Sequence, residues 1–507
     1  MIARIESCLL RGIDASPCEI EVDLDERGMM KQNIVGLPDA AVNESLERVT
    51  AALANSGYPT PLGRLLINLA PADIRKEGPL YDLPIAVGML IAQGTLAART
   101  GGLDHRACVF VGELALDGRI RPVRGVIAMA DMARKQGMQA FICPKDNAPE
   151  AAVVDGIDVF GVRTLSEVMG LLSGEIEPEP EPAPDVAHML RTAEAPIDFS
   201  EVRGQEGVKR AIVVAAAGGH NLVMLGPAGT GKTMMAKALP GVLPPLTPDE
   251  AIEITRIWSA AGQLAPGQAL VTHRPVRTPH HTASSPAIVG GGIIPRAGEI
   301  SLAHKGVLFL DELPEFGRGV LETLRQPMED HVVTIARAHG TVRFPASFML
   351  VAAMNPTPRG DVAPGEVGRR EMEQYLSRLS GPLLDRIDIH VEAPAVPFKQ
   401  LADIPRGTDT AAMRAQAASA RARMNERQGP DTPNARLSGK QLDRFATMSE
   451  RALALLEQAI TGLGLSARAY DKIRRLARTI ADLDDQDGID EAHIAEAVQY
   501  RLLDRKV

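Results

Sequence analysis

The sequence predicts a multidomain α/β protein that ends in an all-helical region. Three observations predict it. Strand-like apolar segments alternate with helical segments along most of the chain, a segment rich in proline and glutamate divides the chain in two, and strand-like segments stop near residue 400. A chain of 507 residues is also too long for one hydrophobic core.

The first predicted domain spans residues 1–172 and is a compact α/β domain. Ile20, Val22 and Leu24 alternate with acidic residues, as in a half-buried strand. A helix is expected from Pro38 to Gly57, because proline favours a helix start and glycine a helix end. Further strands are expected at 65–69, 109–111 and 141–143, and further helices at 82–92, 126–136 and 164–172.

A linker is predicted at residues 173–195. Proline alternates with acids from Glu175 to Asp185, a pattern that cannot form a core and favours an extended, self-repelling spacer.

The remaining chain is predicted to form an α/β core at 196–398 and a helical lid at 399–507. Leu222 to Leu225 is a short apolar strand that leads into a glycine-rich turn and then a helix ending near Pro240, which is half of a βαβ unit. Helices are expected in the lid at 408–427, 438–463, 466–482 and 490–502.

Composition excludes several classes of protein. The chain is 45% hydrophobic and 23% charged with a net charge of −9, which excludes wholesale disorder but does not decide whether a basic pore could hold nucleic acid. The first residues are charged and no long apolar stretch follows, so neither a signal peptide nor a membrane span is expected. The cysteines form no CxxC pair, which favours a reducing cytoplasm: Cys8, Cys18, Cys108 and Cys143.

The segment Gly226-Pro-Ala-Gly-Thr-Gly-Lys-Thr233 matches the P-loop pattern G-x-x-x-x-G-K-[ST], between a predicted strand and a predicted helix. Its glycines let backbone N–H groups close around phosphates, Lys232 reaches the β and γ phosphates, and Thr233 ligates Mg²⁺. ATP and Mg²⁺ are therefore the predicted cofactors. The expected nucleotide-binding residues here are Gly226, Pro227, Ala228, Gly229, Thr230, Gly231, Lys232 and Thr233.

The apolar strand that begins at Val307 ends in two carboxylates, Asp311 and Glu312. Charged groups at the end of a buried strand need a role. We predict that Asp311 holds the Mg²⁺ shell and that Glu312 acts as the general base that polarises the attacking water. A simple pair of charges at a strand end is the alternative.

Three further polar residues are candidates for a role at the nucleotide. Asn355 ends the apolar strand that begins at Phe348 and could orient the water or sense the γ-phosphate, although asparagine is often only a cap. Arg386 could reach a neighbouring subunit's nucleotide as an arginine finger, or be a surface ion pair. Arg468 begins a lid helix and could touch phosphates, or be solvent-exposed. Together with the P-loop and Asp311 they follow the order of an AAA+ ATPase module.

Two segments are predicted to project from this module. Residues 272–296 are rich in glycine, proline, histidine and arginine and are interpreted as an inserted loop, and residues 329–344 are interpreted as a hairpin. In a ring such loops face the pore, where their cations could grip a phosphodiester backbone. A metal site at His273, His280 and His281 is the competing interpretation, but helical spacing and a cysteine partner are both missing.

Several segments resemble one known family, the magnesium-chelatase-like AAA+ proteins called ComM or YifB, and the resemblance runs from Met1 to Arg505. Besides the P-loop, the matching segments are Gly204-Gln-Glu-Gly-Val-Lys-Arg-Ala211, Pro279-His-His-Thr-Ala-Ser-Ser285, Gly298-Glu-Ile-Ser-Leu-Ala-His304, Leu310-Asp-Glu-Leu-Pro-Glu-Phe316, Ser380-Gly-Pro-Leu-Leu-Asp-Arg-Ile-Asp388 and Leu465-Ser-Ala-Arg-Ala-Tyr470.

The resemblance implies a ring, expected to be a homohexamer, that binds DNA and acts as a branch-migration helicase in recombination or in the uptake of transforming DNA during competence. It implies a helix-2 insert and a hairpin lining the pore. It places Arg386 at the neighbouring subunit's nucleotide and leaves open which subunit Arg468 serves.

The N-terminal domain resembles the ribosomal-S5-like fold of the Lon proteolytic domain, through Lys76-Glu-Gly-Pro-Leu-Tyr-Asp82 and Gly112-Glu-Leu-Ala-Leu-Asp-Gly-Arg119. The positions of the Lon serine and lysine fall on Leu80 and about Ile127. Peptidase activity is therefore not expected.

One segment departs from the family pattern. Members carry a Cys-Pro-Cys-Gly pattern after the sensor asparagine and a second cysteine pair downstream. Here the chain reads Asn355-Pro-Thr-Pro-Arg-Gly-Asp361, and residues 365–374 contain no cysteine, so no zinc is expected.

Two other functions stay open. A magnesium-chelatase-type ATPase uses the same ATP chemistry to remodel partner subunits, but its partner chains carry a D-x-S-x-S metal site, and Asp14-Ala-Ser-Pro-Cys18 fails at the second serine. A scaffold that binds ATP without turnover is less natural, because Glu312 is present.

Overall fold

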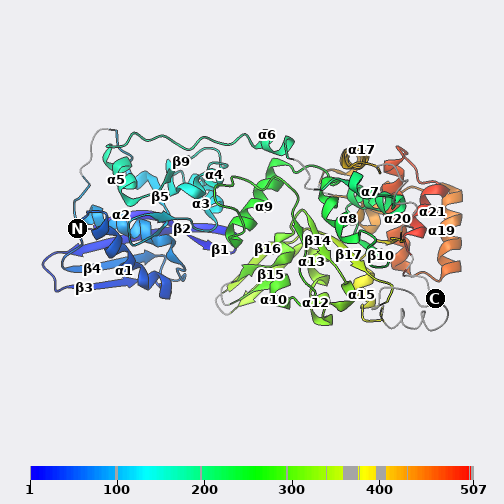
Figure 1. Cartoon of the computed structure of the whole chain (residues 1–507), viewed down its shortest axis with the longest axis horizontal. Coiled ribbons are helices and arrows are strands. Elements are labelled where there is room, and N and C mark those ends of the chain that lie inside the picture. The colour runs from blue at the N-terminus through cyan, green and yellow to red at the C-terminus, as the bar shows by residue number, and fades with distance from the viewer. Residues whose placement is uncertain are drawn as a thin grey trace. The chain divides into compact units, whose positions relative to one another are not determined.

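The structure is a computed structural model that describes residues 2–96, 101–193, 197–292, 295–337, 340–357, 375, 377–395, 407–430, 432–501 and 503. It forms two compact units (Figure 1). Unit 1 contains Met1–Arg191 and Pro248–Thr272, and unit 2 contains Thr192–Thr247 and His273–Val507. Each unit has its own hydrophobic core. Among the described residues, no helix is long and apolar enough to cross a membrane.

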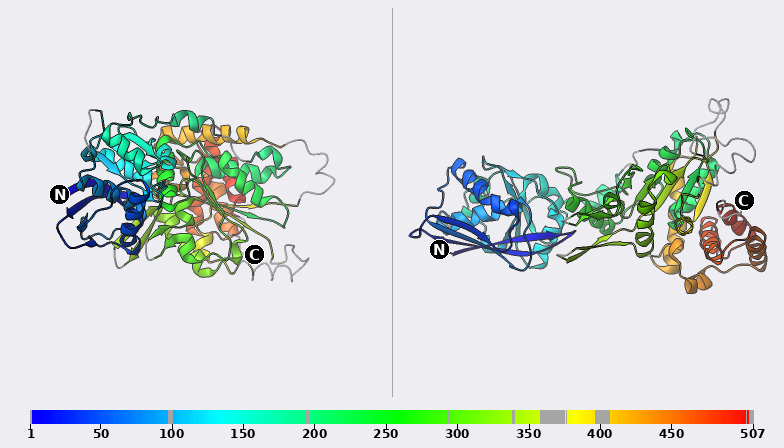
Figure 2. Two further views of the ribbon diagram at one scale, coloured as in Figure 1. Left: turned by 60° about the vertical axis from the view of Figure 1, so that its left-hand side comes forward. Right: turned by 90° about the horizontal axis from the view of Figure 1, so that it is seen from below.

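Unit 1 is built on a mixed seven-stranded sheet with the order β3-β4-β2-β1-β5-β8-β9. β1 and β2 are long antiparallel neighbours and are coloured blue in Figures 1 and 2. The side chains of Ile20, Val22 and Leu24 on β2 are buried, which confirms the alternation seen in the sequence. The strands are β1 (Ile2–Arg11), β2 (Asp14–Asp25), β3 (Lys31–Val35), β4 (Arg64–Ala70), β5 (Cys108–Phe110), β8 (Ala140–Pro144) and β9 (Asp158–Val162), with a separate pair β6 (Glu113–Leu114) and β7 (Ile120–Arg121).

The predicted helices of unit 1 are confirmed. α2 is apolar almost all round and nearly every residue of it is buried, because it packs on β1 and β2 and also contacts α1. The Asp39 carboxylate caps α1 by accepting a hydrogen bond from Val42 N at 2.8 Å. The helices are α1 (Ala40–Asn55), α2 (Asp82–Ala92), α3 (Val126–Lys135), α4 (Ala148–Ala151), α5 (Leu165–Ser173) and α6 (Val186–Arg191).

The proline- and glutamate-rich segment is extended, as expected, but it is also attached to unit 1. Glu181 N donates to Val159 O at 2.7 Å, and the Glu181 carboxylate lies 2.5 Å from Lys145 Nζ. Lys145 neutralises one of the repelling acids, and a backbone hydrogen bond attaches this part of the segment to β9.

Residues 248–272 pack with unit 1, although they lie inside the predicted ATPase core in the sequence. They contain helix α9 (Pro248–Ala261). Gly125 N donates to Ser259 Oγ at 2.9 Å, Gly267 N donates to Asp146 O at 3.0 Å, and Arg256 forms an ion pair with Asp14 at 2.8 Å. A hydroxyl, a backbone amide and a guanidinium thus hold this segment on the N-terminal fold.

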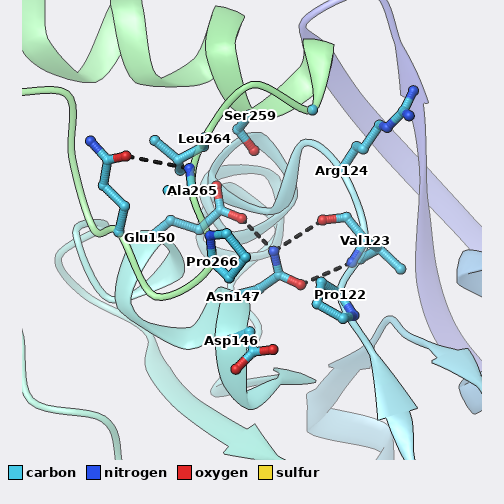
Figure 3. Close-up of a pocket in the computed structure, with 12 residues that line it drawn as sticks. Pro122, Val123, Arg124, Asp146, Asn147, Glu150, Ser259, Leu264, Ala265 and Pro266 are labelled. Carbon is cyan, nitrogen blue, oxygen red and sulfur yellow. Dashed lines mark hydrogen bonds between the residues drawn. The ribbon is translucent and has the colours of Figure 1, made fainter.

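A cavity of about 190 Å³ lies where this segment meets the loops around Val123 and Asn147 (Figure 3). The buried Glu150 side chain lines it, and its carboxylate accepts a hydrogen bond from Asn147 Nδ2 at 2.7 Å. Burial raises the pKa of Glu150 from 4.5 to about 7, against the opposing hydrogen bonds of Ser259 and Asn147.

Glu150 therefore makes the stability of unit 1 depend on pH. Between about pH 4.5 and 7 the unfolded chain releases the proton of this carboxyl while the folded chain keeps it, so rising pH destabilises the fold across this window. We expect Glu150→Gln to remove the penalty and to raise the unfolding free energy at pH 8 by about 1–3 kcal/mol, with little change at pH 4.5. Thermal unfolding of both proteins across this pH range measures the difference.

The control for this prediction is Glu47→Gln, which removes an exposed carboxylate from α1 of the same unit. If Glu150→Gln and Glu47→Gln change the pH dependence equally, the buried carboxyl is not the source of the effect.

Unit 2 is built on a five-stranded sheet with the order β11-β14-β17-β10-β18, in which every neighbouring pair is parallel. The strands are β10 (Leu222–Leu225), β11 (Val276–Arg277), β14 (Val307–Leu310), β17 (Met349–Met354) and β18 (Ile389–Glu392). β14 and β17 are buried along their whole length, as expected for strands covered on both faces.

The C-terminal helices gather beside this sheet and are coloured orange to red in Figure 2. α17 and α20 both pack on α7 (Glu206–Gly218), which contacts β18. The expected helix at 438–463 is wrong as a single element, because residues 446–449 interrupt it. The helices are α17 (Thr410–Gln428), α18 (Gly439–Phe445), α19 (Glu450–Leu463), α20 (Ala467–Leu483) and α21 (Glu491–Gln499).

The predicted hairpin is confirmed, since β15 (Val332–Arg337) pairs antiparallel with β16 (Gly340–Pro345). The segment 272–296 is more ordered than the inserted loop that was expected: it contributes β11 to the sheet and contains α10 (Ser285–Val289) and the pair β12 (Gly290–Gly291) and β13 (Arg296–Ala297). The remaining short helices are α8 (Lys232–Ala238), α11 (Glu299–Leu302), α12 (Arg318–Thr323), α13 (Arg325–Asp330) and α15 (Gly381–Leu384).

Candidate nucleotide site

The predicted nucleotide-binding residues lie at the carboxyl ends of three neighbouring strands. The P-loop follows β10, Asn355 follows β17, and Asp311 follows β14. Because the strands are parallel and β17 pairs with both of the others, these three ends meet at one edge of the sheet. Leu225 at the end of β10 is paired with Met354, the residue before Asn355.

The P-loop has the backbone that a phosphate cradle needs. Gly229 and Gly231 have φ values of +80° and +83°, which other residues rarely adopt. A Cβ on Gly226 would lie 2.1 Å from Ala393 O, so no side chain fits at that position. Thr230 Oγ1 donates to Pro227 O at 3.1 Å and closes the turn.

Lys232 is buried at the start of α8 and points its ammonium into this loop. Nζ lies 2.7 Å from both Gly226 O and Pro227 O and 3.2 Å from Asn355 Oδ1. Burial lowers the pKa of Lys232, while the charge of Asp311 acts in the opposite direction. The loop and strand β17 thus converge on a single cation.

Thr233 and Asp311 form the second contact of the site. Thr233 Oγ1 donates to Asp311 Oδ2 at 2.7 Å, and Asp311 Oδ1 accepts a hydrogen bond from Glu312 N at 3.0 Å. A hydroxyl and a carboxylate at this spacing are hard oxygen donors, the ligands that Mg²⁺ prefers. The residues present therefore fit a magnesium ion at Thr233 and Asp311.

Glu312 stands at the rim of the site in an unusual backbone conformation. Its φ is +52°, in the left-handed region that a non-glycine residue seldom occupies, and its side chain is half exposed. The two acids have different partners, since the Asp311 carboxylate contacts Thr233 and the Glu312 carboxylate contacts His281. Residues with such a backbone often occur at functional sites.

His281 is a site residue that the sequence did not reveal. Its Nδ1 lies 3.4 Å from Glu312 Oε2, its ring lies 4.1 Å from that of His280 between centroids with the planes tilted by 34°, and it makes an edge-to-face contact with Phe316. The sequence places the histidine pair in the predicted inserted loop, with a metal site as the competing interpretation, and gives no sign of its contact with Glu312. Among the described residues, no group of three or more His, Cys, Asp or Glu could hold a metal ion.

Arg386 and Arg468 lie away from this cluster. Arg386 precedes β18 by three residues, and since β18 is parallel to β10, Arg386 lies at the amino edge of the sheet, about 13 Å along the strands from the P-loop edge. Its guanidinium donates to Pro382 O at 2.7 Å and pairs with Glu329. Arg468 pairs with Asp385 at 2.8 Å, next to Arg386 in the chain.

Two further expectations from the sequence concern the segment after Asn355 and the N-terminal domain. The cysteine-free segment after Asn355 lies mostly outside the described residues, since 358–374 are not among them. Leu80 and Ile127 are buried apolar residues of unit 1 and offer neither a nucleophile nor a base.

Three family models match consecutive parts of the chain. "Subunit ChlI of Mg-chelatase" matches residues 20–147, "Magnesium chelatase, subunit ChlI" matches 198–401, and "Magnesium chelatase, subunit ChlI C-terminal" matches 407–501. The matches thus cover part of the sheet of unit 1, from within β2 to β8, together with the P-loop sheet and the C-terminal helices.

The chain is also similar to curated proteins along its whole length. It is 42% identical to the competence protein ComM of Haemophilus influenzae over 99% of this chain and 98% of that protein, and 42% identical to YifB of Escherichia coli over 97% and 96%. It is 28% identical to the magnesium-chelatase 38 kDa subunit of Rhodobacter capsulatus, over 33% of this chain and 52% of that subunit. The fold, the P-loop geometry and these full-length similarities together show that the chain belongs to the ComM/YifB family of magnesium-chelatase-like AAA+ proteins.

Proposed function

We propose that the protein is an ATP-hydrolysing motor that works as a ring of six copies in the cytoplasm and drives branch migration of DNA in recombination or natural transformation. The observation that carries the ATPase part is the convergence of Lys232, Asn355, Thr233 and Asp311 at one sheet edge with Glu312 beside them. The DNA part is supported by the full-length similarity to a competence protein.

Each residue of the site has a distinct role in the proposed hydrolysis. The backbone amides of the P-loop and Lys232 hold the phosphates, and Thr233 and Asp311 hold Mg²⁺, which offsets the charge that develops on the phosphate oxygens. Glu312 accepts a proton from the attacking water, and the Asn355 amide orients that water without repelling the phosphate. Oriented donors of this kind lower the barrier because they need no rearrangement during the reaction.

Arg386 and Arg468 are proposed to act on the nucleotide of a neighbouring copy. Arg386 lies at the amino edge of the sheet and the P-loop at the carboxyl edge, so the two cannot meet within one chain by side-chain movement alone. Asp385 holds Arg468 next to the Arg386 segment, so both cations are presented together. A ring places that surface against the next copy's P-loop.

The proposed DNA-facing surface is formed by the hairpin and by β12. Arg337 Nε donates to Gly292 O at 3.3 Å, and a Cβ on Gly290 would lie 3.1 Å from Ile335, so the two segments are adjacent. On β16, the buried Val342 and Phe344 alternate with exposed Thr341 and Arg343. The exposed arginines are suited to phosphate contacts, which position the protein without reading sequence.

The first test separates nucleotide binding from hydrolysis. Lys232→Ala should abolish ATP binding, because the cation at the centre of the loop is lost. Glu312→Gln should bind ATP but hydrolyse it about 10²–10⁴-fold more slowly, because the base is lost and the phosphate site remains. Nucleotide binding measured by fluorescence and turnover measured by phosphate release give both values. Wild-type turnover in Glu312→Gln would show that Glu312 is not the base.

The second test concerns DNA. We expect the ATPase rate to rise with single strands, duplex or a four-way junction, and the stimulation to weaken as salt rises, because phosphate contacts release counterions. Arg386→Ala should lower turnover by about 10³-fold with ATP binding retained. The matched control is Arg378→Ala, which removes an exposed arginine that pairs with Glu315. An ATPase rate that no DNA changes would contradict the DNA part of the proposal.

A magnesium-chelatase-type remodelling ATPase is the second candidate, favoured by the descriptions of the three family models. The similarity to the chelatase subunit itself covers only a third of the chain, whereas ComM and YifB match nearly all of it. ATP turnover that responds to a porphyrin with chelatase partner subunits, and not to DNA, would favour this candidate.

A further inference from the structure

The segment that carries Arg386 is held by side chains from distant parts of unit 2. It joins α15 to β18, so its carbonyl groups at 386–388 lie outside a regular helix or strand. Arg386 O accepts a hydrogen bond from Asn221 Nδ2 at 2.9 Å. Ile387 O accepts from Arg501 Nη1 at 2.8 Å and from Lys472 Nζ at 3.2 Å, and Asp388 O accepts from Arg501 Nη1 at 3.0 Å. Three consecutive carbonyls are thus bonded to side chains.

The two cations in this arrangement are buried. Lys472 is 7% exposed and Arg501 is 1% exposed, so both have lost nearly all contact with water. Burying a charge is costly unless partners are fixed in good geometry. Cations placed here keep the backbone of residues 387 and 388 in one position, because any shift would leave a buried charge without its acceptor.

Asp388 supplies the opposite charge. Its carboxylate lies 3.5 Å from His220 Nδ1 and 3.8 Å from Lys472 Nζ. Burial alone would raise the pKa of Asp388, but His220, Lys472 and Arg501 together hold that pKa below its ordinary value. The carboxylate therefore stays ionised and balances the buried cations.

Asn221 connects this segment to the strand that bears Asn355. Its Nδ2 donates to Arg386 O, and its Oδ1 accepts a hydrogen bond from Leu350 N at 2.8 Å, near the start of β17. Asn221 is also bonded through its backbone to Asp388 and lies directly before β10. The side-chain amide of Asn221 thus uses both its donor and its acceptor. Substitution by alanine would remove both hydrogen bonds, and substitution by aspartate would remove the donor.

We propose that Asn221, Lys472 and Arg501 are positioning residues that fix the backbone of residues 385–388 and so aim Arg386 at the nucleotide of the neighbouring copy. This inference rests on the proposed function. Lys472 and Arg468 lie four residues apart on α20 and both contact this segment, so one helix holds it at two points. The three residues act through Arg386 and touch no nucleotide.

Mixed rings of two variants test this proposal. In the proposed ring one copy supplies the P-loop and its neighbour supplies Arg386, so a defect in each part can be carried by a different copy. Lys232→Ala copies cannot bind ATP but carry a normal Arg386 segment, whereas Asn221→Ala copies have an intact P-loop and a displaced finger. Alone, Asn221→Ala should lose on the order of 10- to 100-fold in kcat with KM for ATP little changed. Mixed with Lys232→Ala, its ATPase rate should exceed the sum of the two separate rates.

The controls distinguish the possible failures. Arg386→Ala mixed with Lys232→Ala must recover activity if the finger acts between copies, and failure there would contradict the proposed function itself. If the ATPase activity recovers in mixed rings with Arg386→Ala but not with Asn221→Ala, this inference is wrong and the proposed function is not affected. A loss of ATP affinity in Asn221→Ala would also contradict this inference alone. Asn55→Ala removes a similar amide-to-carbonyl bond, 2.7 Å to Leu116 O in unit 1, and should leave turnover unchanged.

A second variant covers the case in which Asn221→Ala loses its cooperative melting transition. Lys472→Met keeps most of the side-chain volume and removes one donor to Ile387 O, while Arg501 still bonds the same carbonyl. It should show the same lowered kcat and the same recovery in mixed rings. Wild-type kcat in Lys472→Met would contradict the proposal.

Discussion

The parallel arrangement of the five-stranded sheet is the constraint on which the rest of unit 2 depends. β10 has only four residues and is paired with β17 on one side and β18 on the other. Parallel pairing puts the P-loop and Asn355 at the carboxyl edge and Asn221 and Arg386 at the amino edge, about 13 Å away. One short strand therefore separates the residues proposed to hydrolyse a nucleotide from those proposed to act on the next copy's nucleotide.

The two edges of the sheet differ in how far their polar groups are buried. At the carboxyl edge the polar groups border the surface: Glu312 is about half exposed and Thr233 is exposed, as a site that admits ATP requires. At the amino edge Lys472 and Arg501 are buried and donate to backbone carbonyls, and the buried His220 lies 3.5 Å from the Asp388 carboxylate. Buried charges of this kind gain little net stability, but they restrict the backbone to one conformation. Arg386, which is proposed to act on the nucleotide of another copy, would benefit from that restriction.

Much of this architecture could be predicted from the sequence, because its signals are local. The alternation in β2, the glycines of the P-loop and the apolar strands before Asp311 and Asn355 each depend on a few adjacent residues. Longer-range pairing was not predictable. The pattern at 438–463 suits one helix, but Ser449 N donates to Ile489 O and Ile489 N donates to Thr447 O, and this pairing with a distant residue breaks the helix. Likewise, nothing in residues 248–272 indicates that they pack on the N-terminal fold.

The contact between His281 and Glu312 joins two residues whose proximity could not be predicted from the sequence. In the sequence, His281 is 31 residues from Glu312 and lies in the segment that was predicted to be an inserted loop, with a metal site as the competing interpretation. In the fold, the loop of His281 leads into α10 and β12, and β12 lies against the hairpin through Gly292 and Arg337. About ten residues of chain thus join the surface proposed to contact DNA to His281, which contacts the proposed general base. Under the proposed function, this contact between His281 and Glu312 is the physical connection between the proposed DNA surface and the proposed general base within one copy.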